Sequence, residues 1–544
     1  MASVPAHLVL WLALLAVVGV LYATCLIVYR IFFHPLAKYP GPLLAKVTDA
    51  YMLYHAWKGD RHLEFWRLHE RYGRVVRFGP NSLSFNSNTA LKEIYGFRAN
   101  VRKAEFYDAF GLTRGQSHFE VHPRPNTHNV RDKDIHARKR RVLAHAFSDG
   151  AIKEVERYIL ANIRTFCEAI GDYGRKIPET KGWSSPKNMS DWLNWLTMDI
   201  LGDLCFGKAF HMLDRPDNRY AVDLVGVAAQ RHLLCGTMPI INKLSLDKIL
   251  FHRIAAGRAK YMAYSRQQLT ERTALGDETD RRDFFYYLLK ARDPETGQGF
   301  TMPELWGESN LLIIAGSDTT STAMAATLFY LVRHPDALAK ATQEIRSKFS
   351  ALEDIHQGPQ LTSCTYLRAC IDEAMRLSPS VGGLLPREVL PGGITIDGER
   401  VPAGTVVGTP HYAIHHNPSY YPDPFEYRPE RWIVANNDEA GDEKSATVSG
   451  VSEAEVALAH SAFCPFSIGP RGCIGKGLAY VEMTNTLARV LFMYDVRKAV
   501  GVADPGEGKP GAEWGRHRPG EFQLVDTFTS LKHGPMVEFR RREL

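Results

Sequence analysis

Cysteine is scarce in this sequence, and its spacing fits neither a metal ribbon nor a redox pair. Eight cysteines are spread over 544 residues, and no two of them are separated by only two residues. The spacing therefore excludes zinc-ribbon and thioredoxin-type sites. The density is also far below that of disulfide-stabilised secreted scaffolds. We expect the folded part of the chain to face a reducing compartment.

The sequence also lacks a large excess of either charge, an internal repeat and a long low-complexity linker. It has 66 basic and 60 acidic residues, which gives a formal net charge of +6. That balance argues against a dedicated nucleic-acid-binding protein, so we expect no nucleic-acid partner. With 45% hydrophobic residues and no linker to divide it, the chain is compatible with one large folded domain.

Charged side chains are missing from the N-terminal segment. Its first 29 positions contain no Asp, Glu, Lys or Arg. As a helix, residues 8–29 would extend roughly 33 Å, enough to cross a hydrocarbon core of about 30 Å. The first basic residues, Arg30 and Lys38, follow this run, so the positive-inside rule puts the bulk of the chain in the cytoplasm. A cleaved signal peptide is the alternative, but the segment has no basic start and its apolar run is too long.

These features divide the chain into three predicted parts. Residues 1–30 form a membrane anchor with a single transmembrane helix. Residues 31–42 form a stalk, in which three prolines end the helix and give a stiff, extended exit from the membrane. Residues 43–544 form the folded domain that carries the chemistry.

Within this domain the hydrophobic pattern predicts mostly helix, with small strand elements near both ends. Residues 74–86 alternate as a strand pair around a Gly-Pro turn, and helical patterns dominate from 135 to 376. Residues 392–416 predict short strands joined by glycine and proline turns. The nearly uncharged stretch 311–332 could be a second membrane span. Asp318 at its centre and its many small and hydroxyl residues favour a buried central helix instead.

The strongest motif is FSIGPRGCIG, residues 466–475, which has the form F-x-x-G-x-R-x-C-x-G. The thiolate of Cys473 is a strong donor to iron and raises the electron density there, which favours O–O cleavage. Gly469 and Gly475 are expected to let the backbone turn tightly and to aim N–H groups at the sulfur. Arg471 can form a charge-assisted pair with a haem propionate, and Phe466 can pack against the macrocycle. A buried free cysteine in an ordinary turn is the alternative, which five fixed positions in ten residues disfavour.

In this loop the sequence resembles the cytochrome P-450 family of haem-thiolate enzymes, and its layout is most like that of microsomal, fungal-type members. The resemblance implies a mainly α fold with small β-sheets, the cytochrome P-450 fold, preceded here by a single N-terminal transmembrane helix. It also implies haem b as the cofactor, with Cys473 as the axial ligand to the iron, and dioxygen as co-substrate.

The stretch AGSDTT, residues 315–320, resembles the central-helix signature of this family. Asp318 and Thr319 supply a carboxylate and a hydroxyl that can relay protons through water, which makes them the implied catalytic residues. Gly316 leaves room for oxygen, and Thr319 is expected to interrupt a helical hydrogen bond and open a groove for water. A packing stretch of small residues is the alternative, but the position of this stretch before the cysteine loop favours a functional role.

A second motif, EAMR at residues 373–376, has the form E-x-x-R and puts both charges on one helix face. Taken alone, the pair is a weak surface salt bridge. The resemblance makes Glu373 and Arg376 part of a buried triad with Arg431, which holds the cysteine loop in place. We expect loss of any member to prevent haem incorporation, because an uncompensated buried charge remains.

Further propionate contacts follow from the resemblance. In HARKRR, His136 occupies the position where tryptophan is common in the family, and Arg140 follows four residues later. The segment PRE, residues 386–388, begins ten residues after Arg376, and the resemblance makes its arginine, Arg387, the third propionate contact. A solvated basic helix face is the alternative for the HARKRR segment.

A basic docking face is expected on the cysteine side of the haem. It would comprise Arg138, Lys139, Arg141 and Lys476. Such a face suits an acidic flavoprotein that donates electrons. The implied partners are NADPH-cytochrome P-450 reductase, with cytochrome b5 as a second candidate.

Together these motifs predict a monooxygenase of the endoplasmic reticulum membrane that inserts one atom of O2 into a lipophilic small molecule, in secondary metabolism, with NADPH as the electron source. By analogy, the substrate pocket is walled by residues 101–131, 313–315 and 381–385 and by the segment around Phe528. Two alternatives remain: an isomerase or dehydratase of the haem-thiolate type that needs no external electrons, and a non-catalytic haem-binding protein of the membrane. Asp318 and Thr319 argue against both, and the expected basic docking face also argues against the second.

Overall fold

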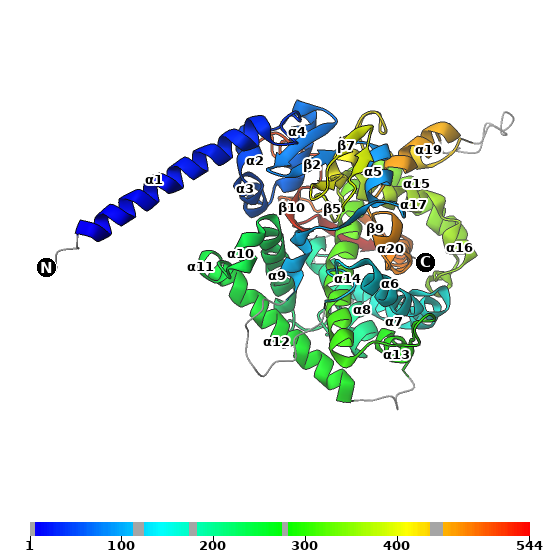
Figure 1. Cartoon of the computed structure of the whole chain (residues 1–544). Helices are drawn as coiled ribbons and strands as arrows, with labels where there is room; N and C mark the ends of the chain where they lie inside the picture. Colours follow the sequence, from blue (N-terminus) through cyan, green and yellow to red (C-terminus); the bar gives the residue numbers. More distant parts are fainter. Residues whose placement is uncertain (1–5, 112–124, 173–181, 275–280, 436–449, 544) are drawn as a thin grey trace.

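A computed structural model describes residues 6–111, 125–172, 182–274, 281–435 and 450–543. Over these residues the chain is mainly helical (Figure 1). The α-helices are α1 (Ala6–Val28), α2 (Leu43–Val47), α3 (Ala50–Lys58), α4 (Arg61–Tyr72), α5 (Asn88–Tyr95), α6 (Lys133–Ala144), α7 (Asp149–Ile170), α8 (Met189–Phe206), α9 (Tyr220–Thr237), α10 (Pro239–Lys243), α11 (Asp247–Leu250), α12 (His252–Ala274), α13 (Phe284–Lys290), α14 (Met302–Leu331), α15 (Pro335–Lys348), α16 (Pro359–Thr362), α17 (Thr365–Leu377), α18 (His411–His415), α19 (Glu453–Ala462) and α20 (Lys476–Met493).

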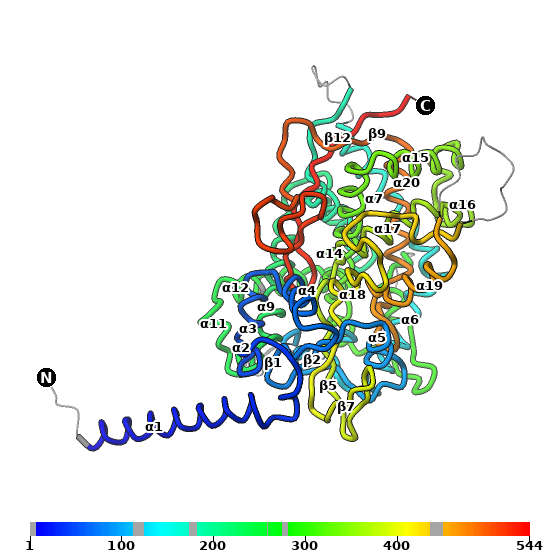
Figure 2. The backbone as a smooth tube through the Cα atoms, turned by 90° about the horizontal axis from the view of Figure 1, so that it is seen from above, coloured from blue at the N-terminus to red at the C-terminus, as the bar shows by residue number. Residues whose placement is uncertain are grey.

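The strands pair into small sheets, as the alternating segments predict. They are β1 (Val75–Gly79), β2 (Ser82–Phe85), β3 (Val101–Lys103), β4 (Lys187–Asn188), β5 (Arg387–Val389), β6 (Ile394–Ile396), β7 (Glu399–Val401), β8 (Val406–Gly408), β9 (Tyr494–Lys498), β10 (Leu524–Thr527), β11 (Thr529–Lys532) and β12 (Met536–Arg541). The largest sheet has the order β1-β2-β8-β5-β3, and the others are β4-β12-β9, β6-β7 and β10-β11. These small sheets lie in different parts of the body, with β9 and β12 far from β1, β2, β5 and β7 (Figure 2). The predicted strand pair is the β1–β2 hairpin, with Val75 opposite Phe85.

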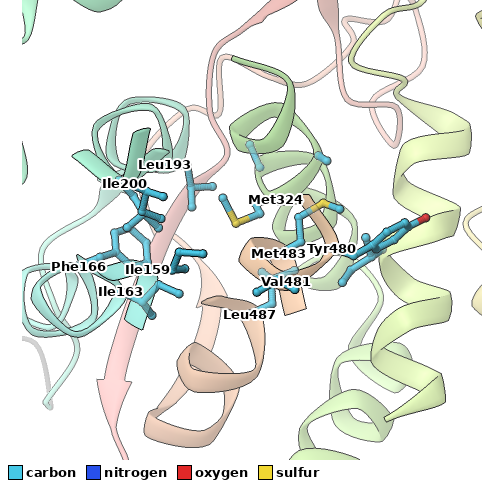
Figure 3. Close-up of a cluster of buried hydrophobic side chains, with 14 of the residues drawn as sticks. Ile159, Ile163, Phe166, Leu193, Ile200, Met324, Tyr480, Val481, Met483 and Leu487 are labelled. Carbon is cyan, nitrogen blue, oxygen red and sulfur yellow. The ribbon is translucent and has the colours of Figure 1, made fainter. Parts of the chain in front are cut away.

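Helix α14 runs through the middle of the body and packs against α8, α17 and α20. Its start is fixed by a capping box, in which Thr301 and Glu304 satisfy each other's backbone N–H groups. Nearly every side chain from Ser317 to Leu331 is buried, so the prediction of a buried central helix is correct. Figure 3 shows part of the core that surrounds it, where side chains of α7 and α8 approach those of α14 and α20, among them Ile159, Ile163, Phe166, Leu193, Ile200, Met324, Met483 and Leu487.

Helix α1 projects away from the body, and its apolar side chains are almost all exposed (Figures 1 and 2). The continuous helical segment His7–Phe33 is long and apolar enough to cross a membrane. It runs past residue 30 because a π-helical turn, Tyr29–Phe33, continues α1.

The predicted extended exit after this helix is wrong. Residues 34–39 form turns that fold back onto the body, where Leu36 and Tyr39 are buried in the core next to the β1–β2 hairpin. Arg77 of β1 donates to the backbone oxygen of Arg30 at 2.8 Å, so the end of the apolar helix is attached to the folded domain.

Candidate active site

A cavity of about 900 Å³ lies between the middle of α14 and the loop that precedes α20. Cys473 lines this cavity. Protein surrounds its side chain, so the surface that Cys473 exposes is the surface that faces the cavity. Seven of the predicted site residues line the same cavity: His136, Arg140, Thr319, Arg387, Phe466, Arg471 and Cys473. The fold therefore gathers residues that are more than 300 positions apart in the sequence.

The loop from Phe466 to Gly475 turns tightly before α20 begins. Gly469 has a φ of +68°, and a Cβ atom there would lie 2.0 Å from the backbone oxygen of Tyr95, so only glycine fits. The Cys473 N–H donates to the oxygen of Phe466 at 2.8 Å, which closes the loop. Gly475 has a φ of −82°, which other residues also adopt, so its place in the turn does not require glycine, while its N–H is directed at the Cys473 sulfur as predicted.

The sulfur of Cys473 has donors and positive charge close by. Burial raises the pKa of the thiol, whereas the Gly475 N–H and the charges of Arg140 and Lys476 act to lower it. Arg140 also donates to the Gly472 oxygen at 2.7 Å, which ties α6 to the loop. The arrangement can therefore favour a thiolate once a cation occupies the cavity next to it.

The cavity is lined by a cluster of four neighbouring cations, none with a carboxylate partner among the described residues: Lys103, Arg140, Arg387 and Arg471. Arg387 donates to Tyr107 Oη at 3.2 Å, and Arg471 donates to the Val130 oxygen at 2.7 Å. Burial, followed by the charge of Arg387, lowers the pKa of Arg471 to about 10. Buried cations normally have anionic partners, so this cluster fits a bound group with carboxylates of its own.

Lys103 belongs to this cluster, and no motif in the sequence pointed to it. Its pKa lies well below the usual value because of burial and because Arg387, Arg471 and Arg140 are near. His136 lines the cavity in its neutral form, since burial and the same cations lower its pKa to about 3. A neutral imidazole can still donate one hydrogen bond to an anion.

On the other side of the cavity, Thr319 and Gly316 of α14 line the wall, but Asp318 does not. Thr319 Oγ1 donates back to the Ala315 oxygen at 2.8 Å, and α14 is unbroken from Met302 to Leu331. The expectation that Thr319 interrupts the helix is therefore wrong. A Cβ at Gly316 would lie 3.0 Å from Leu201 Cδ1, so this glycine also lets α8 approach α14.

Glu373, Arg376 and Arg431 meet in one buried network. The Glu373 carboxylate accepts from Arg376 through both oxygens at 2.9 Å and from Arg431 Nε at 2.8 Å. Arg376 also donates to the His415 oxygen at 2.8 Å, and His415 Nε2 accepts from the Cys464 N–H at 3.0 Å. The network is thus connected to the segment that enters the cysteine loop.

The predicted basic face is only partly present. Lys139 is buried and paired with Glu304 at 3.1 Å and with Glu308 at 3.4 Å, so it is not a surface residue. Arg141 is paired with Asp293 at 2.6 Å, and Arg138 is paired with Glu304. These pairs connect α6 to the start of α14 and to the preceding loop. Of the four residues of the predicted face, only Lys476 is exposed and has no ion pair with a described residue.

The walls above the cavity combine predicted and unpredicted segments. Residues 126–129, Val381, Leu385 and Phe528 line it as expected, whereas residues 112–124 of the predicted wall lie outside the described residues. Ala228, Ala229, Arg231 and His232 of α9 and several residues of α12 also line it, and sequence patterns missed them because they are ordinary helix positions. Rings cluster at this end, with Phe110 stacked on His232 at 4.4 Å and near Phe528 at 5.0 Å.

Comparison with known proteins agrees with this architecture. The model of the cytochrome P450 family matches residues 40–512. The chain is 40% identical over 521 residues to the cytochrome P450 monooxygenase AKT7 of Alternaria alternata, which covers 96% of this chain and 95% of that protein. It is 39% identical over 521 residues to poxM of Penicillium oxalicum, with 96% and 93% covered.

A solved structure, a cytochrome P450 (CYP102L1), matches with a TM-score of 0.64 and 19% identity over 89% of this chain and 94% of that chain, which supports the fold. Family membership implies a haem-thiolate iron and the use of dioxygen, and the cavity carries a thiol and cations that have no carboxylate partner in the described part of the chain, which suit such a group. The chain belongs to the cytochrome P450 family and is a P450-type monooxygenase.

Proposed function

We propose that this monooxygenase oxidises a lipophilic small molecule with electrons that come from NADPH through a reductase. The observation that carries the proposal is the Cys473 thiol facing a cavity whose opposite wall holds Thr319. Thiolate-ligated haem supplies the electron density that favours O–O cleavage. The relatives with this role are fungal, and for this chain we propose secondary metabolism as the setting.

The side chains of the cavity divide into cofactor-binding and catalytic groups in this proposal. Cys473 binds the iron, Phe466 packs against the macrocycle, and His136, Arg140, Arg387 and Arg471 bind the propionates, with Lys103 as an additional cation. The last assignment is supported by the absence of carboxylate partners for these cations in the described part of the chain. Asp318 and Thr319 move protons toward the cavity, and the Glu373–Arg376–Arg431 network holds the cysteine loop.

The reduced, carbon-monoxide-bound absorption spectrum tests the ligand. We expect a strongly red-shifted Soret band in the purified wild type and none in Cys473→Ala. Haem content measured on both proteins is the control, because the variant must be shown either to have lost haem or to bind it without the thiolate. A wild-type band like that of a histidine-ligated haem would refute the assignment.

NADPH consumption tests the electron source. Purified protein, NADPH-cytochrome P450 reductase and candidate lipophilic substrates should consume NADPH and O2 together, and an isomerase or dehydratase would convert its substrate without either. Rings and apolar side chains at the α9 end of the cavity favour a lipophilic or partly aromatic substrate.

The exposed apolar helix His7–Phe33 supports a membrane location. We propose that residues 1–30 anchor the protein in the endoplasmic reticulum membrane, that residues 31–42 connect the anchor to the catalytic domain, and that residues 43–544 face the cytoplasm. Protection of an N-terminal tag, but not of the C-terminus, from protease in sealed microsomes would support this orientation.

A further inference from the structure

One polar side chain interrupts the apolar wall that the first half of α14 presents to the cavity. From residue 307 to residue 316, the α14 residues that line the cavity are Gly307, Asn310, Leu311, Leu312, Ile314, Ala315 and Gly316. All of them except Asn310 are apolar residues or glycines. Ligand cavities carry few polar groups, and these groups fix the orientation of the molecule that binds.

Contacts with α12 hold the Asn310 amide in one orientation. The Ser265 hydroxyl donates to Asn310 Oδ1 at 3.0 Å, and Asn310 Nδ2 lies 3.7 Å from the sulfur of Met262. If the amide were turned over, its oxygen would face the thioether, and two acceptors would then oppose each other. Ser265 is itself buried. The amide therefore keeps its oxygen on Ser265 and its NH2 group on the side of Met262.

The NH2 group of Asn310 has donor capacity that the protein does not use. An amide NH2 group has two N–H donors, and its partner among the described residues is the Met262 sulfur, which is a weak acceptor. Asn310 is partly exposed, in a wall that is otherwise apolar. A donor in such surroundings is stabilised by an acceptor on a bound molecule, because an N–H group without an acceptor costs free energy there.

The position of Asn310 along α14 sets the length of the molecule that can reach it. Asn310 precedes Thr319 by nine residues. At 1.5 Å per residue, the two positions are roughly 13.5 Å apart along the helix axis. Between them, Leu311, Ile314 and Ala315 give the cavity an apolar wall. A molecule that reaches both positions is elongated and apolar in its middle, with a hydrogen-bond acceptor far from its other end.

We propose that Asn310 is a specificity-determining residue, which binds a carbonyl oxygen of the substrate through its Nδ2 N–H group and places the oxidised carbon at the Thr319 end of the cavity. The substrate class is then a lipophilic molecule with a ketone, ester or amide carbonyl remote from the oxidised carbon, not a plain hydrocarbon. The inference rests on the proposed function, because that function sets oxidation between Cys473 and Thr319. Asn310 binds and orients, and no bond forms or breaks there.

Equilibrium dialysis of the haem-loaded protein with labelled 2-decanone and labelled decane tests the contact without turnover. The two probes have the same chain length and differ in the carbonyl group alone. The measured quantity is the dissociation constant of decane divided by that of 2-decanone. We expect this ratio to be about three- to tenfold larger in the wild type than in Asn310→Leu, which is the range for one neutral hydrogen bond. Leucine has a similar volume, so decane should bind both proteins alike.

Asn88→Leu is the matched control. Asn88 is also partly exposed, and its Nδ2 donates to the Ser461 hydroxyl at 2.8 Å, but neither residue lines the cavity. This variant should keep the wild-type ratio. Carbon-monoxide spectra and thermal unfolding establish that folded, haem-loaded proteins are compared. An unchanged ratio in N310L, or equal decreases in N310L and N88L, would overturn the proposal.

Product analysis tests the orientation. With the reductase and NADPH, the wild type should oxidise 2-decanone toward the end of the chain that is remote from the carbonyl, and N310L should give a mixture of positions. Oxidation next to the carbonyl by the wild type would overturn the assigned orientation. If the wild type bound the ketone with the expected ratio but oxidised nothing, the proposed function would fail and the contact with Asn310 would stand.

Discussion

Replacing Glu373 with glutamine tests the buried network that adjoins the cysteine loop. Both oxygens of Glu373 are in use: one accepts from Arg376, Arg431 and the Arg428 N–H, and the other from Arg376 and Trp432 Nε1. The amide of Glu373→Gln has the same size, but in either orientation its NH2 group faces at least two N–H donors. The substitution therefore removes a charge and opposes donor to donor, with no change in volume.

The expected loss of unfolding free energy in this variant follows from the burial of the charges. Glu373 and Arg376 are fully buried and Arg431 is nearly so. Burial favours a protonated Glu373, but Arg376 and Arg431 keep the pKa of Glu373 below its usual value. Breaking a buried pair costs about 3–5 kcal/mol, and here two guanidinium groups lose their counter-charge, so the upper end applies. A protein of ordinary stability, about 5–15 kcal/mol, would lose a third or more of it.

Urea unfolding followed by circular dichroism, together with haem content per chain, measures the effect. We expect lower unfolding free energy and lower haem content, since Arg376 is connected through His415 to Cys464 in the segment before the cysteine loop. Glu399→Gln is the matched control, because its pair with Lys38 is exposed and exposed ion pairs contribute little to stability. If E373Q lost no more stability than E399Q and kept full haem, the argument from buried charge would be refuted.

Three further predictions follow from single features of the structure. Gly469→Ala should lower haem content while circular dichroism stays native, because a Cβ at this positive φ would meet the Tyr95 oxygen at 2.0 Å; full haem loading would contradict this. Burial lowers the pKa of His62 to about 3 and of His411 to about 4. The unfolded chain therefore binds more protons below pH 6.5, so stability should be complete above that pH and should fall by about 1.4 kcal/mol per unit and per histidine as the pH decreases toward 4. Urea unfolding midpoints that did not change from pH 7 to pH 5 would contradict this predicted loss of stability. Deletion of residues 2–33 should move the protein from the membrane pellet to the soluble fraction, and unchanged pelleting would argue against α1 as the anchor.

Local chemistry explains how much of this molecule could be predicted from its sequence. The cysteine loop was found because its residues are close together in the chain, and the strand pair and central helix were found because periodicity is a local property. Two local predictions failed where tertiary contacts decided the outcome. The stalk folds back because Leu36 and Tyr39 enter the core, and Lys139 is buried because Glu304 and Glu308 of α14 lie opposite it.

The cations that no motif revealed show why a motif gives an incomplete site. Lys103 is one residue of a three-residue strand, and only the pairing of β3 with β5 brings it to Arg387, its partner in that register. Lys532 ends β11, more than 200 residues after Asp318, with which it pairs at 3.4 Å. Each is buried, and a buried lysine is stable only where an anion is near. Lys532 has that anion within the protein, whereas Lys103 has none among the described residues, and this difference supports the proposal that Lys103 binds the carboxylates of a bound group.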